Sequence, residues 1–444
     1  MCVSTGTGER RRPPADRDGT VKIAIGPHES FDQIEIPDRN LVGVYGPSSA
    51  PEHDEKALLV RALEQPLGRP GLDDFIADAE DVVVLVNDPS RATPTPMALE
   101  HVWDAFGTRQ VSVVVATGSH RVPDEAGLSY IFGRMLRRIR PCIQIHRARD
   151  DEEMITLGRT SRGTEVAINR RVRDASRVVV IGSLEPHYFA GFTGGRKSFL
   201  PGVSAYRTIE GNHRLALLPD AKCLKLDGNP VHEDMLEAME VIGEENVFAL
   251  QFVIDGKRRL ASACAGELGA AFAASLGPAK EIASVPVHGL MDVVIAVVNP
   301  PMDIDLYQSH KAIQHASLAV RDGGILILVS SCREGVGPST FHEILAGVEN
   351  PGDVRAIIGE RPYRLGDHTA ARFADVLERV RVCAVTDLPP GVLERVFVEA
   401  ASDVQGAIDR ALGEVGQDAR VLVLTDANVV VPNVQVRDPG DVGV

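Results

Sequence analysis

The stretch DVVVLV, Asp81 to Val86, is apolar at every position after the first and consists of valines and one leucine. A strand of this composition is buried on both faces, as in a parallel sheet that helices cover on either side. Five further runs have the same character and recur between stretches of helical pattern: Val111 to Thr117, Ser176 to Gly182, Asp292 to Val298, Gly323 to Ser331 and Asp418 to Asp426. The sequence therefore predicts an α/β protein with largely parallel sheets.

The length of the chain suggests more than one domain. Its 444 residues, 44% of them hydrophobic, suffice for about two cores of ordinary size. We expect a flexible tail at residues 1–20, an N-terminal domain at 21–270 and a C-terminal α/β domain at 289–444. The Ala/Gly-rich segment 271–288 is interpreted as a hinge, and a helix followed by a Pro-containing loop explains it equally well.

Charge and cysteine content narrow the functional class. The formal net charge is −15 and the pI is about 5.4, which argues against nucleic acid or an anionic membrane as the main partner. The six cysteines lie far apart with no C-x-x-C pair, so neither a zinc site nor a disulfide framework is indicated. No run approaches the roughly 18 apolar residues of a membrane span. We expect a cytoplasmic protein.

Cationic and imidazole side chains follow four of the predicted strands. Ligands of open α/β sheets bind beyond the carboxyl ends of the strands, where loops and helix N-termini converge. The first loop carries Arg91 with Asp88, the second His120, the third His187, Arg196, Lys197 and His213, and the fourth Lys311 and His315 with Tyr307. The last three recur every fourth residue and so share one face of a predicted helix. Together these loops predict a site for a small anion.

The segment GFTGGRKSFLPG, Gly191 to Gly202, is similar to a phosphate-binding P-loop but departs from it at one position. A P-loop requires a glycine directly before its lysine, so that successive backbone N–H groups can surround phosphate oxygens. Arg196 occupies that position here, and its side chain obstructs such a cradle. Lys197 therefore needs another explanation.

The motifs TGSHR, EPHYFAGFTGGRKSFLPGVSAYRTIEGNH and DLYQSHK resemble the lactate racemase family of nickel-pincer-nucleotide enzymes. The resemblance runs from about Asp81 to His368 and includes SCREGVG and GDHTAARF. It implies a racemase or epimerase that inverts the C2 centre of a 2-hydroxy carboxylate. In this family, hydride moves reversibly to a pyridinium ring, and the active site lies in a cleft between the two domains.

The resemblance also implies a covalent cofactor, a pyridinium-3,5-bisthiocarboxylic acid mononucleotide that holds nickel. Lys197 matches the family's covalent attachment point. His213 matches the fourth nickel ligand, a role that suits a neutral imidazole in square-planar geometry. The remaining residues expected at the cofactor are Gly194, Gly195, Arg196, Ser198 and Gln308.

Two histidines match the family's pair of catalytic bases, His120 and His187. Each enantiomer presents its hydroxyl differently, so two groups that titrate near neutral pH are needed. The expected substrate contacts are Asp88, Arg91, Tyr307 and Lys311, in which Arg91 can bind a carboxylate with two hydrogen bonds.

One departure from the family concerns substrate size. True lactate racemases have a tryptophan near the substrate in the C-terminal domain, whereas the only tryptophan here is Trp103, in the first domain. The corresponding region offers His368 and Arg372, four residues apart, and His315 is a further candidate. These polar groups predict a hydroxy acid with additional hydroxyls or a second carboxylate, such as a sugar acid or malate.

Two other functions stay open from the sequence. One is a pyridine-nucleotide oxidoreductase with net redox, although no G-x-G-x-x-G follows the first predicted strand. The other is a non-catalytic carboxylate-binding homologue. We expect a small-molecule 2-hydroxy carboxylate as the ligand, the cofactor-synthesis enzymes as transient partners, and no nucleic-acid or membrane partner; a homodimer is an open alternative to a monomer.

Overall fold

The computed structural model describes residues 10–11, 13–16, 19–26 and 33–435. The chain divides into two compact units. The central unit comprises residues 49–280, and the terminal unit comprises residues 1–48 together with 281–444. Each unit is described by itself.

The central unit is built on a six-stranded sheet in the order β14-β13-β10-β5-β6-β7. Its strands are β5 (Asp81–Asn87), β6 (Gln110–Ala116), β7 (Ile143–Ile145), β10 (Arg177–Ser183), β13 (Val247–Ile254) and β14 (Leu260–Gly266). All neighbours are parallel except β13 and β14, which form an antiparallel pair. The first three strand predictions, which became β5, β6 and β10, are confirmed to within a residue at each end.

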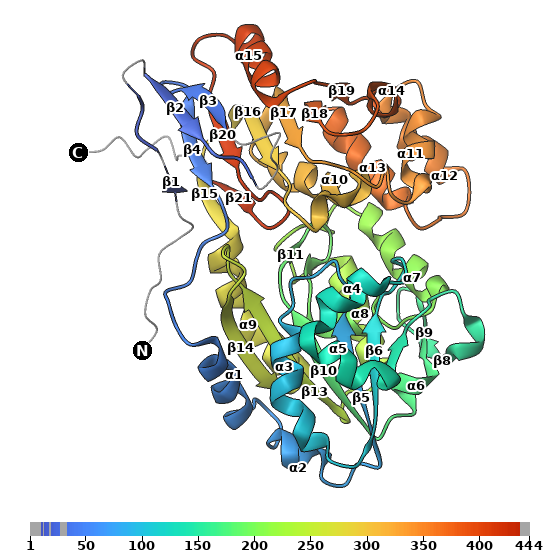
Figure 1. Cartoon of the computed structure of the whole chain (residues 1–444). Helices are drawn as coiled ribbons and strands as arrows, with labels where there is room; N and C mark the ends of the chain where they lie inside the picture. The colour runs from blue at the N-terminus through green and yellow to red at the C-terminus, as the bar shows by residue number, and fades with distance from the viewer. Residues whose placement is uncertain (1–9, 12, 17–18, 27–32, 436–444) are drawn as a thin grey trace. The chain divides into compact units, whose positions relative to one another are not determined.

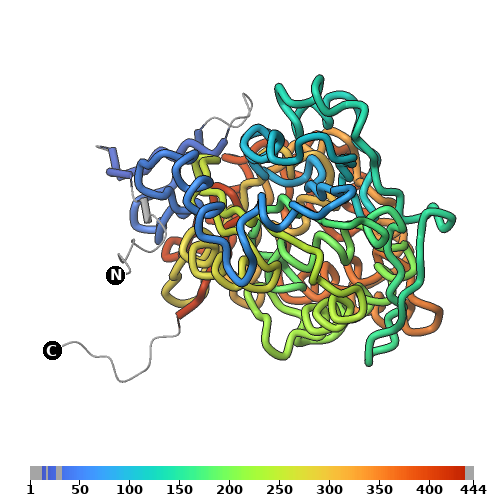
Figure 2. Tube along the Cα trace, turned by 90° about the horizontal axis from the view of Figure 1, so that it is seen from below, coloured from blue at the N-terminus to red at the C-terminus, as the bar shows by residue number. Residues whose placement is uncertain are grey.

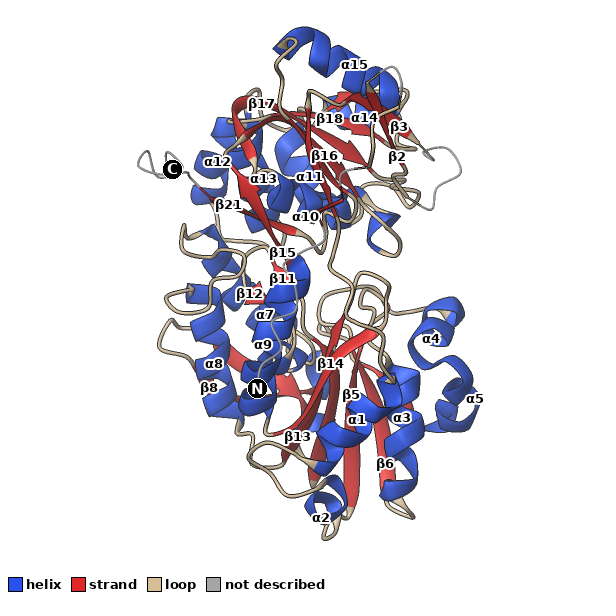
Figure 3. Ribbon diagram, turned by 90° about the vertical axis from the view of Figure 1, so that its left-hand side faces the viewer, coloured by secondary structure: helices blue, strands red, loops and turns tan. Residues whose placement is uncertain are grey.

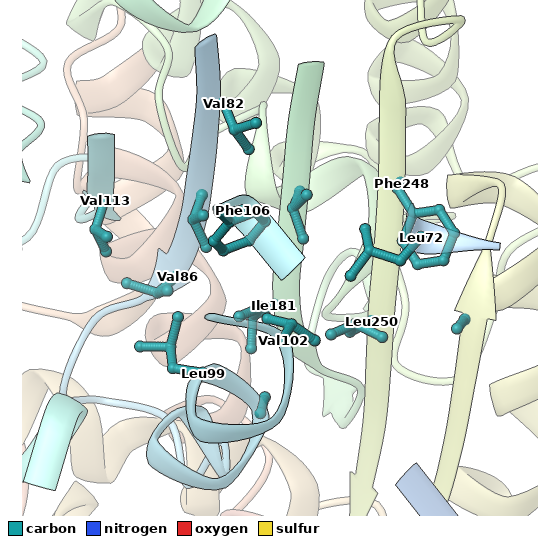
Figure 4. Packing of buried hydrophobic residues seen from close by; sticks show 14 of the residues in the cluster. Leu72, Val82, Val86, Leu99, Val102, Phe106, Val113, Ile181, Phe248 and Leu250 are labelled. Carbon is teal, nitrogen blue, oxygen red and sulfur yellow. The ribbon is translucent and has the colours of Figure 1, made fainter. Parts of the chain in front are cut away.

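Helices lie on either side of these strands (Figure 3). They are α1 (Glu55–Glu64), α2 (Leu72–Ile76), α3 (Thr95–Val102), α4 (Glu125–Phe132), α5 (Leu136–Ile139), α6 (Arg170–Arg173), α7 (Tyr206–His213), α8 (Pro230–Ile242) and α9 (Leu268–Ala283). Figure 4 shows part of the core on one face, where Val86 and Ile181 of the strands lie near Leu99 and Val102 of α3. Two small antiparallel pairs complete the unit: β8 (Met154–Arg159) with β9 (Glu165–Asn169), and β11 (Pro186–His187) with β12 (Gly191–Phe192).

The terminal unit has a seven-stranded sheet in the order β1-β4-β20-β16-β17-β18-β19. The strands are β1 (Arg10–Arg11), β4 (Leu41–Tyr45), β16 (Met291–Val297), β17 (Val320–Val329), β18 (Arg381–Val385), β19 (Glu399–Ala400) and β20 (Val421–Leu424). All neighbours are parallel except β1 and β4. The other three predicted strands are thus confirmed as β16, β17 and β20.

The helices of the terminal unit are α10 (Leu306–Ala316), α11 (Ser339–Ala346), α12 (Val354–Gly359), α13 (Asp367–Leu377), α14 (Pro390–Glu394) and α15 (Val404–Val415). α15 packs on the sheet beside a hairpin formed by β2 (Thr20–Ile23) and β3 (Ile34–Pro37). A further parallel pair consists of β15 (Ser284–His288) and β21 (Val431–Gln435).

The N-terminal segment lies in a different unit from the one that the sequence predicts. Residues 21–48 were expected in the N-terminal domain, yet β4 pairs with β20 of the terminal unit (Figures 1 and 2). The Asn40 side chain fixes this pairing, because its amide donates to the carbonyls of Gln417 and Ala419. The prediction therefore needs correction: residues 21–48 belong to the terminal unit, and β4 joins its seven-stranded sheet.

The predicted tail and hinge also receive more definite structure. Of the tail at 1–20, residues 1–9, 12 and 17–18 lie outside the described residues, and Arg10–Arg11 pair with β4. Residues 271–288, predicted as a hinge, are the rest of α9 followed by β15, and the division between the units falls within α9 at residues 280–281.

Among the described residues, no helix is both long and apolar enough to cross a membrane. Five of the cysteines lie in the described part of the chain, and all five have free thiols.

Candidate active site

Three loops of the central unit begin at the carboxyl ends of adjacent parallel strands. β5 leads to Asp88 and Arg91, β6 leads to His120, and β10 leads to His187 in β11. Because the three strands run in the same direction, these loops meet at one edge of the sheet. The structure thus brings together the first part of the predicted site.

Asp88 and His120 form a close pair. The Nδ1 of His120 lies 2.5 Å from Oδ2 of Asp88, and Oδ1 of Asp88 accepts hydrogen bonds from the backbone N–H and the hydroxyl of Ser90, at 3.1 and 2.6 Å. Burial alone would raise the pKa of Asp88, but the charge and hydrogen bond of His120, with Ser90 and Arg91, lower it to about 2. The carboxylate is therefore ionised at neutral pH. It orients the imidazole so that Nε2 is the nitrogen available for proton transfer.

Arg91 forms an ion pair that the sequence reasoning did not predict. Its Nη1 lies 3.3 Å from Oε2 of Glu185, and both side chains are largely buried, at 16% and 22% exposure. Glu185 directly precedes β11, two residues before His187. The sequence offered one signal for this contact: Glu185 is a carboxylate two residues before the predicted base His187, in the loop that follows β10. Arg91 thus lies at the predicted edge with a carboxylate partner already in place.

His187 is 9% exposed and lies among aromatic rings. Its ring stacks on Tyr188, with centroids 5.2 Å apart, and meets the edge of Phe189 at 4.5 Å. The backbone N–H of Ala190 donates to Nδ1 of His187 at 3.3 Å. We infer that the neutral ring carries its proton on Nε2, opposite to the tautomer that Asp88 selects for His120.

Phe189 joins three of the predicted functional side chains. Besides His187, the ring of His213 meets it with a centroid distance of 5.1 Å, and Nζ of Lys197 lies 5.5 Å from its centroid. Lys197 belongs to a short 3₁₀ segment, Gly195–Ser198, and His213 is the last residue of α7. The structure therefore places the expected covalent anchor, metal ligand and one base around a single aromatic ring.

The buried network beside α7 holds His213 in place. Asn212, the preceding residue, donates through Nδ2 to Oδ2 of Asp234 at 2.9 Å. Asp234 is fully buried in α8 and also accepts the hydroxyl hydrogen bonds of Thr160 and Thr164, at 2.6 and 2.9 Å. The end of α7 is thus tied to α8 and to the turn between β8 and β9.

The glycines of the predicted cofactor loop face the protein interior. Gly194 and Gly195 have φ values of +76° and +50°. A Cβ atom would lie 2.8 Å from Gln251 at the first position and 3.0 Å from Phe272 at the second. The N–H of Gly195 donates to Oε1 of Gln251 at 2.8 Å. These contacts fix the loop that presents Lys197, and they commit the Gly195 N–H to the protein.

Arg196 is also turned inward, at 3% exposure. Its Nη2 donates to the carbonyls of Ala190 and Phe192, at 3.0 and 3.3 Å, and its guanidinium lies 4.7 Å from the ring centroid of Phe272. Burial lowers its pKa to about 9. Arg196, which the sequence predicted at the cofactor, therefore braces the β11–β12 hairpin through Nη2. Ser198, the other residue expected at the cofactor in this loop, is 4% exposed.

In the terminal unit, the predicted helix is α10. Asp305 caps its N-terminus by accepting from the N–H of Gln308 at 2.7 Å. Nζ of Lys311 donates to Oε1 of Gln308 at 2.6 Å, and Tyr307 precedes Gln308 on the first turn. The side chains of Tyr307, Gln308 and Lys311 are all partly exposed, whereas that of His315 on the same helix is buried.

His368 and Arg372 lie on one helix, α13. His368 is 1% exposed, and its ring nitrogens contact the hydroxyls of Tyr363 at 2.7 Å and Thr369 at 3.4 Å. His315 is 2% exposed and its Nδ1 contacts the carbonyl of Ala427 at 3.0 Å. Burial lowers its pKa to about 4, so the ring is neutral at pH 7. Of these candidates for additional substrate contacts, Arg372 is the most exposed.

The described residues contain no group of three or more His, Cys, Asp or Glu side chains that could by itself hold a metal ion. If the nickel-containing nucleotide that the resemblance implies were bound, His213 would be its protein ligand to nickel, and a group of three protein ligands would not be needed. The arrangement of one imidazole and one lysine amine around Phe189 fits such a nucleotide.

Comparison with known proteins gives a consistent family match. Residues 28–223 match the model of the lactate racemase N-terminal domain, and residues 289–431 match that of the lactate racemase C-terminal domain. The chain is 29% identical over 408 residues to a lactate racemase of Lactiplantibacillus plantarum, which covers 88% of this chain and 95% of that protein. It is also 29% identical over 412 residues to a lactate racemase of Thermoanaerobacterium thermosaccharolyticum, covering 90% and 96%.

Solved structures agree with this match. The lactate racemase apoprotein from Thermoanaerobacterium thermosaccharolyticum superposes with a TM-score of 0.83 at 28% identity, covering 93% of this chain and all of that one. A protein from Thermotoga maritima shares the fold, with a TM-score of 0.67 at 15% identity over 82% of this chain and 96% of its own.

Proposed function

This chain belongs to the lactate racemase family, and on that basis we propose that it is a racemase or epimerase that inverts the C2 centre of a 2-hydroxy carboxylate. The proposal includes a nickel-pincer nucleotide attached to Lys197, with His213 as the protein ligand to nickel. When bound, this group supplies an acceptor for the hydrogen at C2 of the substrate. The side chains of the protein then have to bind the acid and move the hydroxyl proton.

His120 is the proton acceptor best prepared by its surroundings. Because Asp88 holds its Nδ1 at 2.5 Å, Nε2 can receive a hydroxyl proton, and the neighbouring carboxylate stabilises the imidazolium that results. Asp88 is almost fully buried, which strengthens this electrostatic effect.

His187 is prepared for the opposite role. The hydrogen bond from the Ala190 N–H leaves the proton of the neutral ring on Nε2, where it can be donated to the oxygen of a planar 2-oxo acid. A reversible inversion needs one ring that accepts and one that donates, with the roles exchanged in the reverse direction. The different hydrogen bonds of His120 and His187 supply that difference.

The substrate carboxylate requires cationic partners. Arg91 offers a planar guanidinium beside the catalytic edge, and Lys311 and Tyr307 are the proposed further contacts from α10. The predicted contacts with additional polar groups of a larger acid now rest mainly on Arg372, since His368 and His315 form hydrogen bonds within the protein.

The observation that supports this function most strongly is the gathering of His187, Lys197 and His213 around Phe189. The test is racemisation by protein co-produced with the cofactor-synthesis enzymes, starting from one enantiomer of lactate, malate or gluconate and followed by chiral chromatography. The proposal predicts formation of the C2-inverted acid without net production of NADH or of a 2-oxo acid. Stoichiometric formation of a 2-oxo acid with consumption of a nicotinamide cofactor would instead establish an oxidoreductase. The absence of both products would favour a non-catalytic binding homologue.

A further inference from the structure

The Arg91–Glu185 pair connects two loops of the catalytic edge. Arg91 follows β5, and Glu185 follows β10, the adjacent parallel strand. At 16% and 22% exposure, the two side chains are shielded from water more than an ordinary surface ion pair, so the pair has a defined geometry. It uses Nη1 of Arg91 and leaves the other guanidinium nitrogens for a second partner.

Glu185 is itself fixed from several directions. Its Oε1 lies 3.3 Å from the hydroxyl of Ser183, and its backbone N–H donates to the hydroxyl of Thr193 at 2.8 Å. The carbonyl of Glu185 accepts from the Thr193 N–H at 2.8 Å, which closes the base of the hairpin that carries His187. The carboxylate therefore has little freedom to move away from Arg91.

Two carboxylates lie close to Arg91, those of Asp88 and Glu185. Arg91 forms an ion pair with Glu185, and its charge also lowers the pKa of Asp88, so both carboxylates interact with this guanidinium. The charge of Glu185 also reaches Tyr130: burial raises the pKa of Tyr130, Arg258 lowers it, and Glu185 adds a smaller effect that raises it. A substrate that binds Arg91 therefore meets the field of a carboxylate that is only partly neutralised.

We propose that Glu185 is a positioning and specificity residue: it holds Arg91 for the substrate carboxylate, and its negative charge favours 2-hydroxy acids whose additional groups are hydroxyls over those with a second carboxylate. This inference rests on the proposed function, because it assigns Arg91 to the carboxylate of the substrate. It deepens that function by choosing between sugar acids and dicarboxylic acids. Hydroxyl groups can donate to the acceptors of Asp88 and Glu185, whereas a second carboxylate is repelled by them.

The positioning role is tested with two substitutions. Glu185→Gln retains an oxygen that can accept from Arg91, and Glu185→Ala removes it. We expect KM for lactate to rise at least about fivefold in Glu185→Ala, because this variant loses one hydrogen bond to a charged group. In Glu185→Gln, KM should stay within about threefold of the wild type. Equal KM values in the two variants and the wild type would refute the positioning role.

The charge role is tested by the preference between malate and lactate. In Glu185→Gln, kcat/KM for malate relative to lactate should rise roughly three- to tenfold, because malate carries the additional negative charge. Gluconate relative to lactate should not rise. Glu100→Gln on α3 is the matched control: it removes the same charge from an arginine-paired glutamate that is also 22% exposed, and it should leave both ratios unchanged.

Binding measurements separate this inference from the proposed function. Calorimetric Kd values for lactate and malate with the full-length protein should show the same shift in Glu185→Gln, even if no racemisation is found. An unchanged malate-to-lactate ratio in kinetics and calorimetry would overturn the inference while leaving the racemase proposal intact. The same shift in Glu100→Gln, or no detectable binding of either acid, would also overturn it.

Discussion

Replacement of Asp88 by asparagine is the most informative single change in the catalytic edge. The side chain keeps its size and can still accept a hydrogen bond from Nδ1 of His120, but the negative charge is lost. The surroundings lower the pKa of Asp88 from 3.8 to about 2 despite its burial. At 1.36 kcal/mol for each pKa unit, this corresponds to about 2 kcal/mol of preference for the ionised carboxylate beside His120 and its other partners.

If racemisation protonates His120, Asp88→Asn should lose a stabilisation of this size in the transition state. We therefore expect kcat to fall at least about 30-fold, and more if the amide selects the other tautomer of the imidazole. Ser90→Ala is the matched control, because it removes one hydrogen bond to the same carboxylate and should lower kcat less than about tenfold. Chiral chromatography of initial rates in both directions measures these effects. A kcat for Asp88→Asn within threefold of the wild type would refute the role of the Asp88–His120 pair.

Three other predictions follow from the same geometry. His120→Ala and His187→Ala should each lower racemisation by more than about 10²-fold. With a substrate deuterated at C2, the wild type should retain the deuterium in its product, and extensive exchange with solvent would contradict hydride transfer. Arg372→Ala should lower kcat/KM for gluconate or malate while sparing lactate, and equal effects on all three acids would remove Arg372 from the substrate site. Stability should fall as the pH drops from about 6.5 towards 4, by about 1.4 kcal/mol per pH unit for each buried histidine, because the folded protein keeps these rings neutral while the unfolded chain protonates them. These residues are His146, His232, His310 and His315, whose pKa values are lowered to about 4, 3, 3 and 4. Urea midpoints that do not change between pH 7 and 5 would contradict this last prediction.

The sheet strands could be predicted because burial on both faces leaves a local mark. Runs such as Val82 to Val86 are apolar throughout, and each of the six predicted runs became a strand. The placement of β4 could not be predicted in this way. Its partner β20 lies almost four hundred residues further along the chain, and no local pattern specifies which sheet a strand joins.

Side-chain direction was the other feature beyond the reach of sequence reasoning. Arg196 stands next to Lys197, and from the sequence both were expected at the cofactor. In a tight 3₁₀ segment, neighbours point in different directions, and Arg196 turns to the carbonyls of the hairpin. His368 was expected to face a substrate, whereas burial beside Tyr363 provides its hydrogen bond inside the protein. Residue type therefore predicted the chemistry of the loops better than the partners of each group.

The most direct test of the racemase proposal is the intact mass of the protein co-produced with the cofactor-synthesis enzymes, combined with nickel analysis, for the wild type, Lys197→Ala and His213→Ala. We predict a covalent adduct and nickel in the wild type, neither in Lys197→Ala, and an adduct with reduced or absent nickel in His213→Ala. A wild-type protein that racemises a 2-hydroxy acid without an adduct, or a Lys197→Ala variant that retains the full adduct, would contradict the account.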